Sequence, residues 1–185
     1  EEMTAEKIII DVGARTNLPE ISGREATGYI CSETLFGDKY PKQPYKSLII
    51  VGGGPIGCEF SHIFAAAGTK VTVVQHNNRL LSKADEDISE QIRQNMEAFG
   101  IKTYLNANLL EAKKADDQKI LLFEDRETGE RIEVTGEEIM YATGIKPVSK
   151  ELKIENTAIE TDERGWIKTN EFLETSVNGI WAIGD

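Results

Sequence analysis

The feature that most constrains this chain is a glycine-rich turn between a buried strand and a helix. The turn reads Gly52-Gly53-Gly54-Pro55-Ile56-Gly57. It follows the continuous apolar run Ser47–Val51, which is typical of a parallel strand covered on both faces, and it opens a predicted helix over residues 56–67. A strand, a turn with this glycine spacing and a helix in this order predict the start of a dinucleotide-binding βαβ unit.

Each glycine of the spaced motif has its own reason to lack a side chain. Gly52 permits a tight turn, Gly54 lets a pyrophosphate approach the backbone, and Gly57 lets the helix pack closely on the strand. Free N–H groups at the start of the helix then bind the phosphates. The other members of the turn complete the predicted site: Gly53, Pro55 and Ile56. The alternative is a purely structural turn, although three glycines are costly at a helix start without a ligand.

The remaining pattern predicts an α/β fold. Further buried strands are expected over 7–10, 70–75, 101–104, 138–142 and 179–183, and a second helix over 85–99. Residues 14–46 read as a connector with at most a short helix or turn near Ser32–Phe36. Short strands with turn residues between them predict antiparallel hairpins over 108–113, 118–124 and 131–135. We therefore expect a Rossmann-like parallel sheet with helices on both faces and an antiparallel β-hairpin or meander insert.

The end of the second strand bears on the choice between NAD and NADP. An Asp or Glu about 20 residues into the motif favours NAD, whereas a nearby Arg favours the phosphate of NADP. Here Gln75 can hydrogen-bond a ribose hydroxyl, and His76 and Arg79 could contact a phosphate. The choice between the two cofactors stays open, with a slight preference for NAD because neither position 75 nor position 76 carries an Arg. Arg79 can equally be a solvated surface charge.

Charge and composition exclude several kinds of partner. The formal net charge of −11 argues against binding to nucleic acid or to an anionic membrane. No apolar run approaches the ~20 residues that a bilayer span needs. Cys31 and Cys58 form no metal-type pair and, with the scattered His62 and His76, predict free thiols and no metal site. We expect a globular chain in the reducing cytoplasm.

Several motifs together resemble one family. They are Val51–Phe60, Gly68–Val74, Arg79-Leu80-Leu81 with Asp85, the Ala-Thr-Gly motif in Tyr141–Pro147, and Ala182-Ile183-Gly184-Asp185. This set is similar to the pyridine nucleotide–disulfide oxidoreductases, which include dihydrolipoamide dehydrogenase, mercuric reductase and soluble transhydrogenase. In that family the nicotinamide domain is inserted into a two-part FAD domain. The resemblance implies an NAD(P)-binding domain over 14–150, with 1–13 and 151–185 as flanking strips of the FAD domain.

The family's flavin glycine turn, redox cysteine pair and C-terminal dimerisation domain with its catalytic His have no counterpart in these 185 residues. We therefore expect an excised domain that binds a dinucleotide, holds no catalytic residue and is inactive by itself. The expected parent is a homodimeric flavoenzyme that carries FAD.

The resemblance also assigns roles to single positions. Glu59 matches a glutamate near the nicotinamide carboxamide, although an acidic residue early in a helix is also favoured by the helix dipole. Pro55 stands where some members have an aromatic gate over the flavin, which argues against such a gate. Leu109 would flank the adenine, Ala142-Thr143-Gly144 would line the nicotinamide ribose, and Asp185 would contact the ribityl chain of FAD.

The leading hypothesis is a domain that places nicotinamide for hydride exchange with a flavin. The alternative from another class is a non-catalytic dinucleotide sensor, for which a flavin-contacting Gly-Asp motif has no use. A flavin-free dehydrogenase is the third hypothesis, and its substrate domain and acid–base residues are not found in the sequence.

Overall fold

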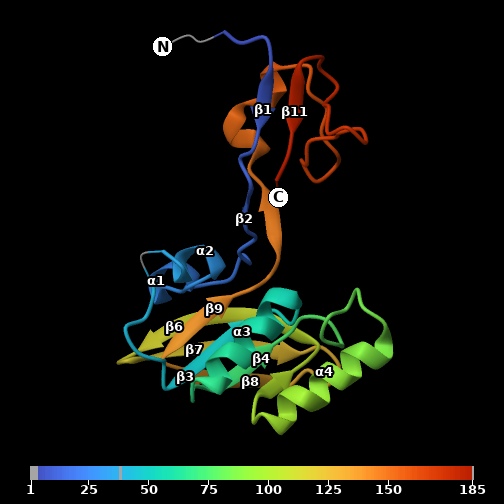
Figure 1. Ribbon diagram of the computed structural model, residues 1–185. Coiled ribbons are helices and arrows are strands. Elements are labelled where there is room, and N and C mark those ends of the chain that lie inside the picture. Colours follow the sequence, from blue (N-terminus) through green and yellow to red (C-terminus); the bar gives the residue numbers. More distant parts are fainter. Residues whose placement is uncertain (1–3, 38, 185) are drawn as a thin grey trace. The chain divides into compact units, whose positions relative to one another are not determined.

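The computed structural model describes residues 4–37 and 39–184 (Figure 1). The chain divides into two compact units. The larger unit is Thr16–Gly144, and the smaller unit is formed by the flanking segments Glu1–Arg15 and Ile145–Asp185. The sequence placed the corresponding boundaries at 14 and 150, so the compact larger unit is slightly shorter than the expected inserted domain.

The larger unit is built on a four-stranded parallel sheet in the order β5-β4-β3-β9. Along the chain, α3 connects β3 to β4 and α4 connects β4 to β5, as predicted. The bounds are β3 (Ser47–Val51), α3 (Pro55–Ala66), β4 (Lys70–Val74), α4 (Glu86–Ala98), β5 (Lys102–Tyr104) and β9 (Glu138–Tyr141). These elements confirm the parallel α/β core, and they lie within one or two residues of the predicted bounds.

The continuous apolar run of β3 is explained by two hydrophobic clusters, one on each face of the sheet. Leu48 and Ile50 belong to the cluster that contains Phe60 and Phe64 of α3 and Met96 of α4. The alternate residues of the same strand, Ile49 and Val51, belong to the second cluster on the opposite face. Because both faces are covered, the four buried positions of the strand, 48–51, are all apolar.

The second face is covered by a three-stranded antiparallel sheet in the order β6-β7-β8 (Figure 1). Its bounds are β6 (Ala107–Ala115), β7 (Gln118–Asp125) and β8 (Arg131–Gly136). The meander was predicted, but helices were expected on both faces. The meander takes the place of a second helical layer because its apolar residues pack on Ile49 and Val51: Ala112, Leu121, Phe123 and Val134.

Shorter elements were less well predicted. The connector before β3 carries two one-turn helices, α1 (Arg24–Thr27) and α2 (Ser32–Leu35), of which only the second was expected. β2 (Ala14–Thr16) and β10 (Ile145–Pro147) form a two-stranded sheet that the sequence did not predict. Neither segment, Ala-Arg-Thr or Ile-Lys-Pro, carries the apolar run that marked Ile8–Ile10 as a strand.

The smaller unit contains a two-stranded parallel sheet of β1 (Ile8–Ile10) and β11 (Ile180–Ala182), both of which were predicted as strands. It also contains the 3-10 helices η1 (Ser149–Leu152) and η2 (Ile154–Asn156). Ile9 is 65% exposed in this sheet.

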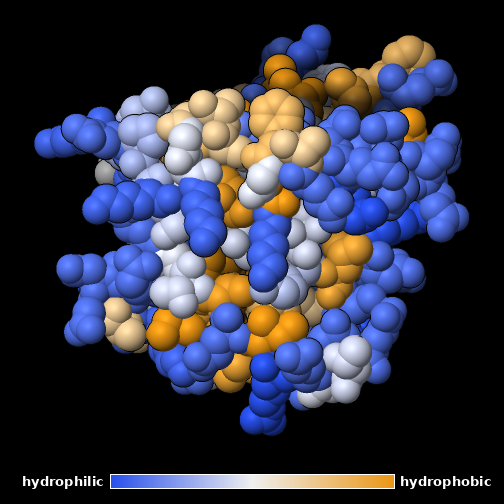
Figure 2. Space-filling model, turned by 90° about the horizontal axis from the view of Figure 1, so that it is seen from below, coloured by the Kyte–Doolittle hydropathy of each residue, from blue (hydrophilic) through white to orange (hydrophobic). Residues whose placement is uncertain are grey.

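The face of the molecule drawn in Figure 2 is mostly polar. Hydrophilic side chains cover most of the face drawn in Figure 2, and hydrophobic residues show in smaller groups between them. Across residues 4–37 and 39–184, no helix is long and apolar enough to cross a membrane. The same residues contain no group of three or more metal-ligating side chains placed to hold an ion.

Candidate functional site

A cleft of about 960 Å³ opens in the larger unit where β3, β4 and β9 end. The carboxyl ends of parallel strands are where open α/β sheets bind ligands. Eleven of the fourteen predicted site residues line it: Gly52, Gly53, Gly54, Pro55, Glu59, Gln75, His76, Leu109, Ala142, Thr143 and Gly144. Ile56 instead packs against the core and Gly57 is buried. Asp185 lies outside the described residues.

Two glycines of the turn are required by the protein itself. Gly52 has a φ of 111°, and a Cβ there would lie 2.3 Å from the carbonyl oxygen of Ala142. A Cβ on Gly57 would lie 1.9 Å from the carbonyl oxygen of Gly52. These contacts match the tight turn and the close helix–strand packing that the motif spacing predicts.

Gly54 differs from them. It is the N-cap of α3 with an ordinary φ of −78°, and a Cβ at this position would meet no atom within 4 Å. Nothing in the folded chain therefore requires glycine here. The space that a side chain would fill belongs to the cleft.

The start of α3 supplies donors to the same space. The N–H of Cys58 donates to the carbonyl of Gly54 at 3.0 Å and begins the hydrogen-bond ladder of the helix. The N–H groups of Gly54, Ile56 and Gly57 precede it, and Pro55 has none to satisfy. Backbone donors at the positive end of a helix attract an anion locally, even in a chain of net charge −11.

Gln75 has a different role from the one expected. Its side chain is buried, its Oε1 accepts the N–H of Gly53 at 2.9 Å, and its Nε2 donates to the carbonyl of Arg79 at 3.2 Å. Both ends of the amide are thus used to hold the glycine turn against the loop after β4. The residue that follows it, His76, is exposed and lines the cleft at the end of β4.

Arg79 does not line the cleft. Its Nη2 donates to the carbonyl of Ser82 at 3.0 Å, and its side chain borders an adjoining polar cavity. That cavity also contains Arg126, from the turn between β7 and β8, whose Nη1 lies 3.3 Å from Nε2 of His76. Sequence spacing could not reveal Arg126, because the meander brings it to His76 from 50 residues away.

At the opposite end of the cleft, Asn17 holds the segment after β9. Its N–H donates to the carbonyl of Gly144 at 2.8 Å, and its carbonyl accepts the hydroxyl of Thr143 at 2.5 Å. Glu59 lines the cleft from the first turns of α3, is exposed and has no hydrogen-bond partner among the described residues. Its carboxylate is therefore available to a ligand.

Leu109 lines the cleft from β6, next to an irregularity of the meander. The register of β6 with β7 shifts between Leu109 and Glu111. A β-bulge leaves one residue unpaired and redirects the neighbouring side chains. Together with Leu81 and Ile92, Leu109 gives the cleft an apolar wall suited to a flat ring.

Sequence reasoning missed several residues that line the cleft. Lys83 is the one lysine or arginine among the described lining residues, and it lies in the loop between β4 and α4. Cys58 also lines the cleft, but burial, and secondarily the Glu59 carboxylate, raises the pKa of its thiol to about 11. The thiol is thus protonated at neutral pH, which excludes it as a nucleophile there.

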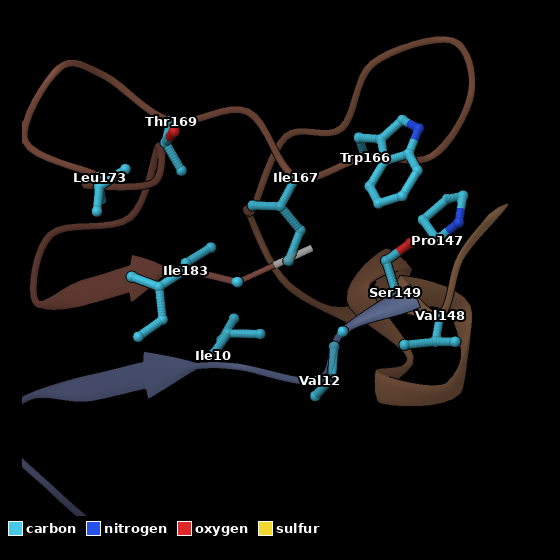
Figure 3. Close-up of a pocket in the computed structure, with 13 residues that line it drawn as sticks. Ile10, Val12, Pro147, Val148, Ser149, Trp166, Ile167, Thr169, Leu173 and Ile183 are labelled. Carbon is cyan, nitrogen blue, oxygen red and sulfur yellow. The ribbon is translucent and has the colours of Figure 1, made fainter. Parts of the chain in front are cut away.

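The smaller unit has a separate pocket of about 250 Å³. In Figure 3 the side chains of Ile10, Val12 and Ile183 line one part of it, and Trp166 and Pro147 line another. Gly13 and Gly184 also border it.

Comparison with known proteins agrees with these motifs. A family model described as pyridine nucleotide-disulphide oxidoreductase matches residues 1–185. A dihydrolipoyl dehydrogenase of Acholeplasma laidlawii is 36% identical over 190 residues, covering all of this chain and 53% of the relative. A mercuric reductase of Lysinibacillus sphaericus is 31% identical, covering all of this chain and 33% of the relative.

A solved structure of the flavoprotein disulfide reductase RclA from Escherichia coli superposes with a TM-score of 0.85 at 32% identity. The match covers 97% of this chain and 39% of that protein. The chain thus spans between a third and about half of the length of these relatives. With a family match over the whole sequence and a cleft built on the family's glycine turn, the chain belongs to the pyridine nucleotide–disulfide oxidoreductases.

Proposed function

We propose that the larger unit binds a nicotinamide dinucleotide and places its nicotinamide for hydride exchange with the flavin of a longer enzyme. The observation that carries the proposal is Gly54, a glycine that the fold does not need, beside free N–H groups at the start of α3. A pyrophosphate fits both features, because it accepts several hydrogen bonds and needs close approach to the backbone.

The two ends of the cleft suit the two ends of such a ligand. The apolar wall at Leu81, Ile92 and Leu109 suits the adenine, and the loop after β4 that begins at His76 borders the expected place of the adenosine ribose. Glu59 and the segment Ala142–Gly144 lie on the other side of the glycine turn and suit the nicotinamide ribose and carboxamide. The dinucleotide supplies the hydride, and these residues bind and orient it.

The smaller unit would contribute to the flavin site of the longer protein. Its pocket of about 250 Å³ falls below the ~300–1,000 Å³ of sites that enclose a small ligand by themselves. A flavin dinucleotide could therefore rest only partly on Val12, Gly13 and Gly184. We extend the proposal to a longer parent enzyme that is homodimeric and cytoplasmic. The two buried free thiols support the second of these properties, because free cysteines are typical of a reducing compartment.

The test is Gly54→Val in the 185-residue chain. Because a Cβ at Gly54 meets no atom within 4 Å, the variant keeps the fold, but the new side chain occupies the predicted place of the pyrophosphate. Calorimetric titration should show that NADH and NADPH both bind at least tenfold more weakly. Ala66→Val, at an exposed position of the same helix, is the matched control and should bind like the parent sequence.

Retained affinity in the Gly54→Val variant would show that the turn is only structural. Absence of heat with either dinucleotide at millimolar concentration, in a chain whose circular dichroism is that of a folded α/β protein, would reject the proposed function altogether.

A further inference from the structure

A polar cavity of about 780 Å³ adjoins the cleft and shares Asn77 and Ser82 with it. It lies beside the loop that follows β4, where the proposed function places the adenosine ribose. Arg79 enters it from that loop, and Arg126 enters it from the meander. Two guanidinium groups thus border one hollow next to the ribose.

These two arginines make no ion pair with a described residue, a property that they share in this acidic chain with Arg164 of the smaller unit. Four other arginines have a carboxylate oxygen within 4.0 Å: Arg15, Arg24, Arg93 and Arg131. Arg79 and Arg126 have no such partner among the described residues. Arg126 donates from Nη1 alone, to the ring and the carbonyl of His76, so its Nε and Nη2 have no acceptor in the described part of the chain.

His76 is itself fully engaged. Its Nδ1 lies 3.2 Å from the carbonyl oxygen of Ala107, which can only accept, so Nδ1 carries the hydrogen. Nε2 is then the acceptor for Arg126 at 3.3 Å. Oε1 of Gln75 is buried against the Gly53 N–H, so neither side chain is placed to accept a ribose 2′-hydroxyl.

Two carboxylates, Glu86 and Glu127, line the same cavity and oppose an anion there. Glu127 already accepts from Nδ2 of Asn106 at 2.8 Å, and neither carboxylate lies within 4.0 Å of Arg79 or Arg126. The arginines consequently keep donors for a ligand, whereas the strand end lacks the acidic residue that selects NAD.

We propose that Arg126, with Arg79, binds the 2′-phosphate of NADP(H), and that Arg126 is the main determinant of cofactor preference. This rests on the proposed function, since it concerns one end of the same ligand. A guanidinium matches a phosphate through two parallel charged hydrogen bonds, which a 2′-hydroxyl cannot form. The His76 ring holds the guanidinium in place from one side.

The test compares adenosine 2′,5′-bisphosphate with 5′-AMP by calorimetry, because these probes differ at the 2′-position alone. The parent sequence should bind the bisphosphate at least tenfold more tightly. In Arg126→Gln this preference should fall at least tenfold, while the affinity for 5′-AMP changes less than twofold. Arg164→Gln is the control, since it removes the same charge at an exposed position outside the cavity.

The preference should also weaken with added salt, because it depends on a charge pair at the surface. Equal binding of the two probes, or equal losses for both in Arg126→Gln, would overturn the assignment while leaving NADH binding and the proposed function intact. A chain that binds no adenosine ligand and no dinucleotide would overturn the proposed function as well.

Discussion

Replacement of Gln75 by Leu tests whether its amide, rather than a bound ligand, is what holds the glycine turn. The side chain is 7% exposed and accepts the N–H of Gly53, which is also buried. Leu is similar in size but accepts nothing, so the Gly53 N–H is left buried without a partner. Such a group costs about 1–3 kcal/mol. The carbonyl of Arg79 also loses its donor, but Arg79 is only half-buried and water can replace it.

We therefore expect Gln75→Leu to lower the free energy of unfolding by about 1–3 kcal/mol. The assay is urea denaturation followed by far-UV circular dichroism, since α3 and α4 both belong to the larger unit. Tryptophan fluorescence is unsuitable because Trp166 and Trp181 lie in the smaller unit. The control is Gln94→Leu, at an exposed position of α4 where a change within about 0.5 kcal/mol is expected.

The reasoning fails if Gln75→Leu and Gln94→Leu lower the stability equally. It also fails if Gln75→Leu is as stable as the parent sequence but loses dinucleotide binding, because the amide would then serve the ligand and not the turn. A loss of stability that exceeds the control by 1 kcal/mol or more supports the structural role.

Two further predictions concern buried groups. Tyr141→Phe removes a buried hydroxyl that has no hydrogen-bond partner among the described residues. The free energy of unfolding in urea should therefore stay level or rise by up to about 1 kcal/mol. A loss of more than about 1 kcal/mol would show that the hydroxyl has a hydrogen-bond partner in solution. Burial, and secondarily the Glu59 carboxylate, raises the pKa of Cys58 to about 11. Alkylation of this thiol by iodoacetamide should therefore be slow at pH 8 and should accelerate as the pH rises towards 11. Mass spectrometry can follow the reaction at this residue. Fast alkylation at pH 8 in the folded chain would contradict the protonated, buried thiol.

The parts of the fold that local patterns determine were predicted well. Ser47–Val51 forms a strand with the predicted bounds because an apolar run that must be covered on both faces has few other structures open to it. The glycine turn was equally clear, since Gly52 and Gly57 are excluded from bearing side chains by the backbone around them. Both constraints act within short stretches of sequence, so they can be predicted without knowledge of the tertiary structure.

The second face of the sheet was beyond such patterns. The turn residues around 118–124 predict a strand of an antiparallel hairpin, and the structure forms β7 over Gln118–Asp125. These turn residues do not predict that Leu121 and Phe123 would pack on Ile49 and Val51 in the place of helices. Which surface an amphipathic strand covers depends on the path of the chain, and that path is a property of the whole unit.

Cofactor selectivity shows the same limit at the level of single residues. The slight preference for NAD was argued from the lack of an Arg at positions 75 and 76, counted along the βαβ unit. Counting along that unit cannot include Arg126, which the turn between β7 and β8 places 3.3 Å from Nε2 of His76. A cation near the ribose can therefore come from the β6–β8 meander instead of the βαβ unit. In that case the sequence of the βαβ unit alone gives the wrong charge for the site. If Arg126 sets the preference as proposed, exchanging the residues at 75 and 76 should move it less than exchanging Arg126 does.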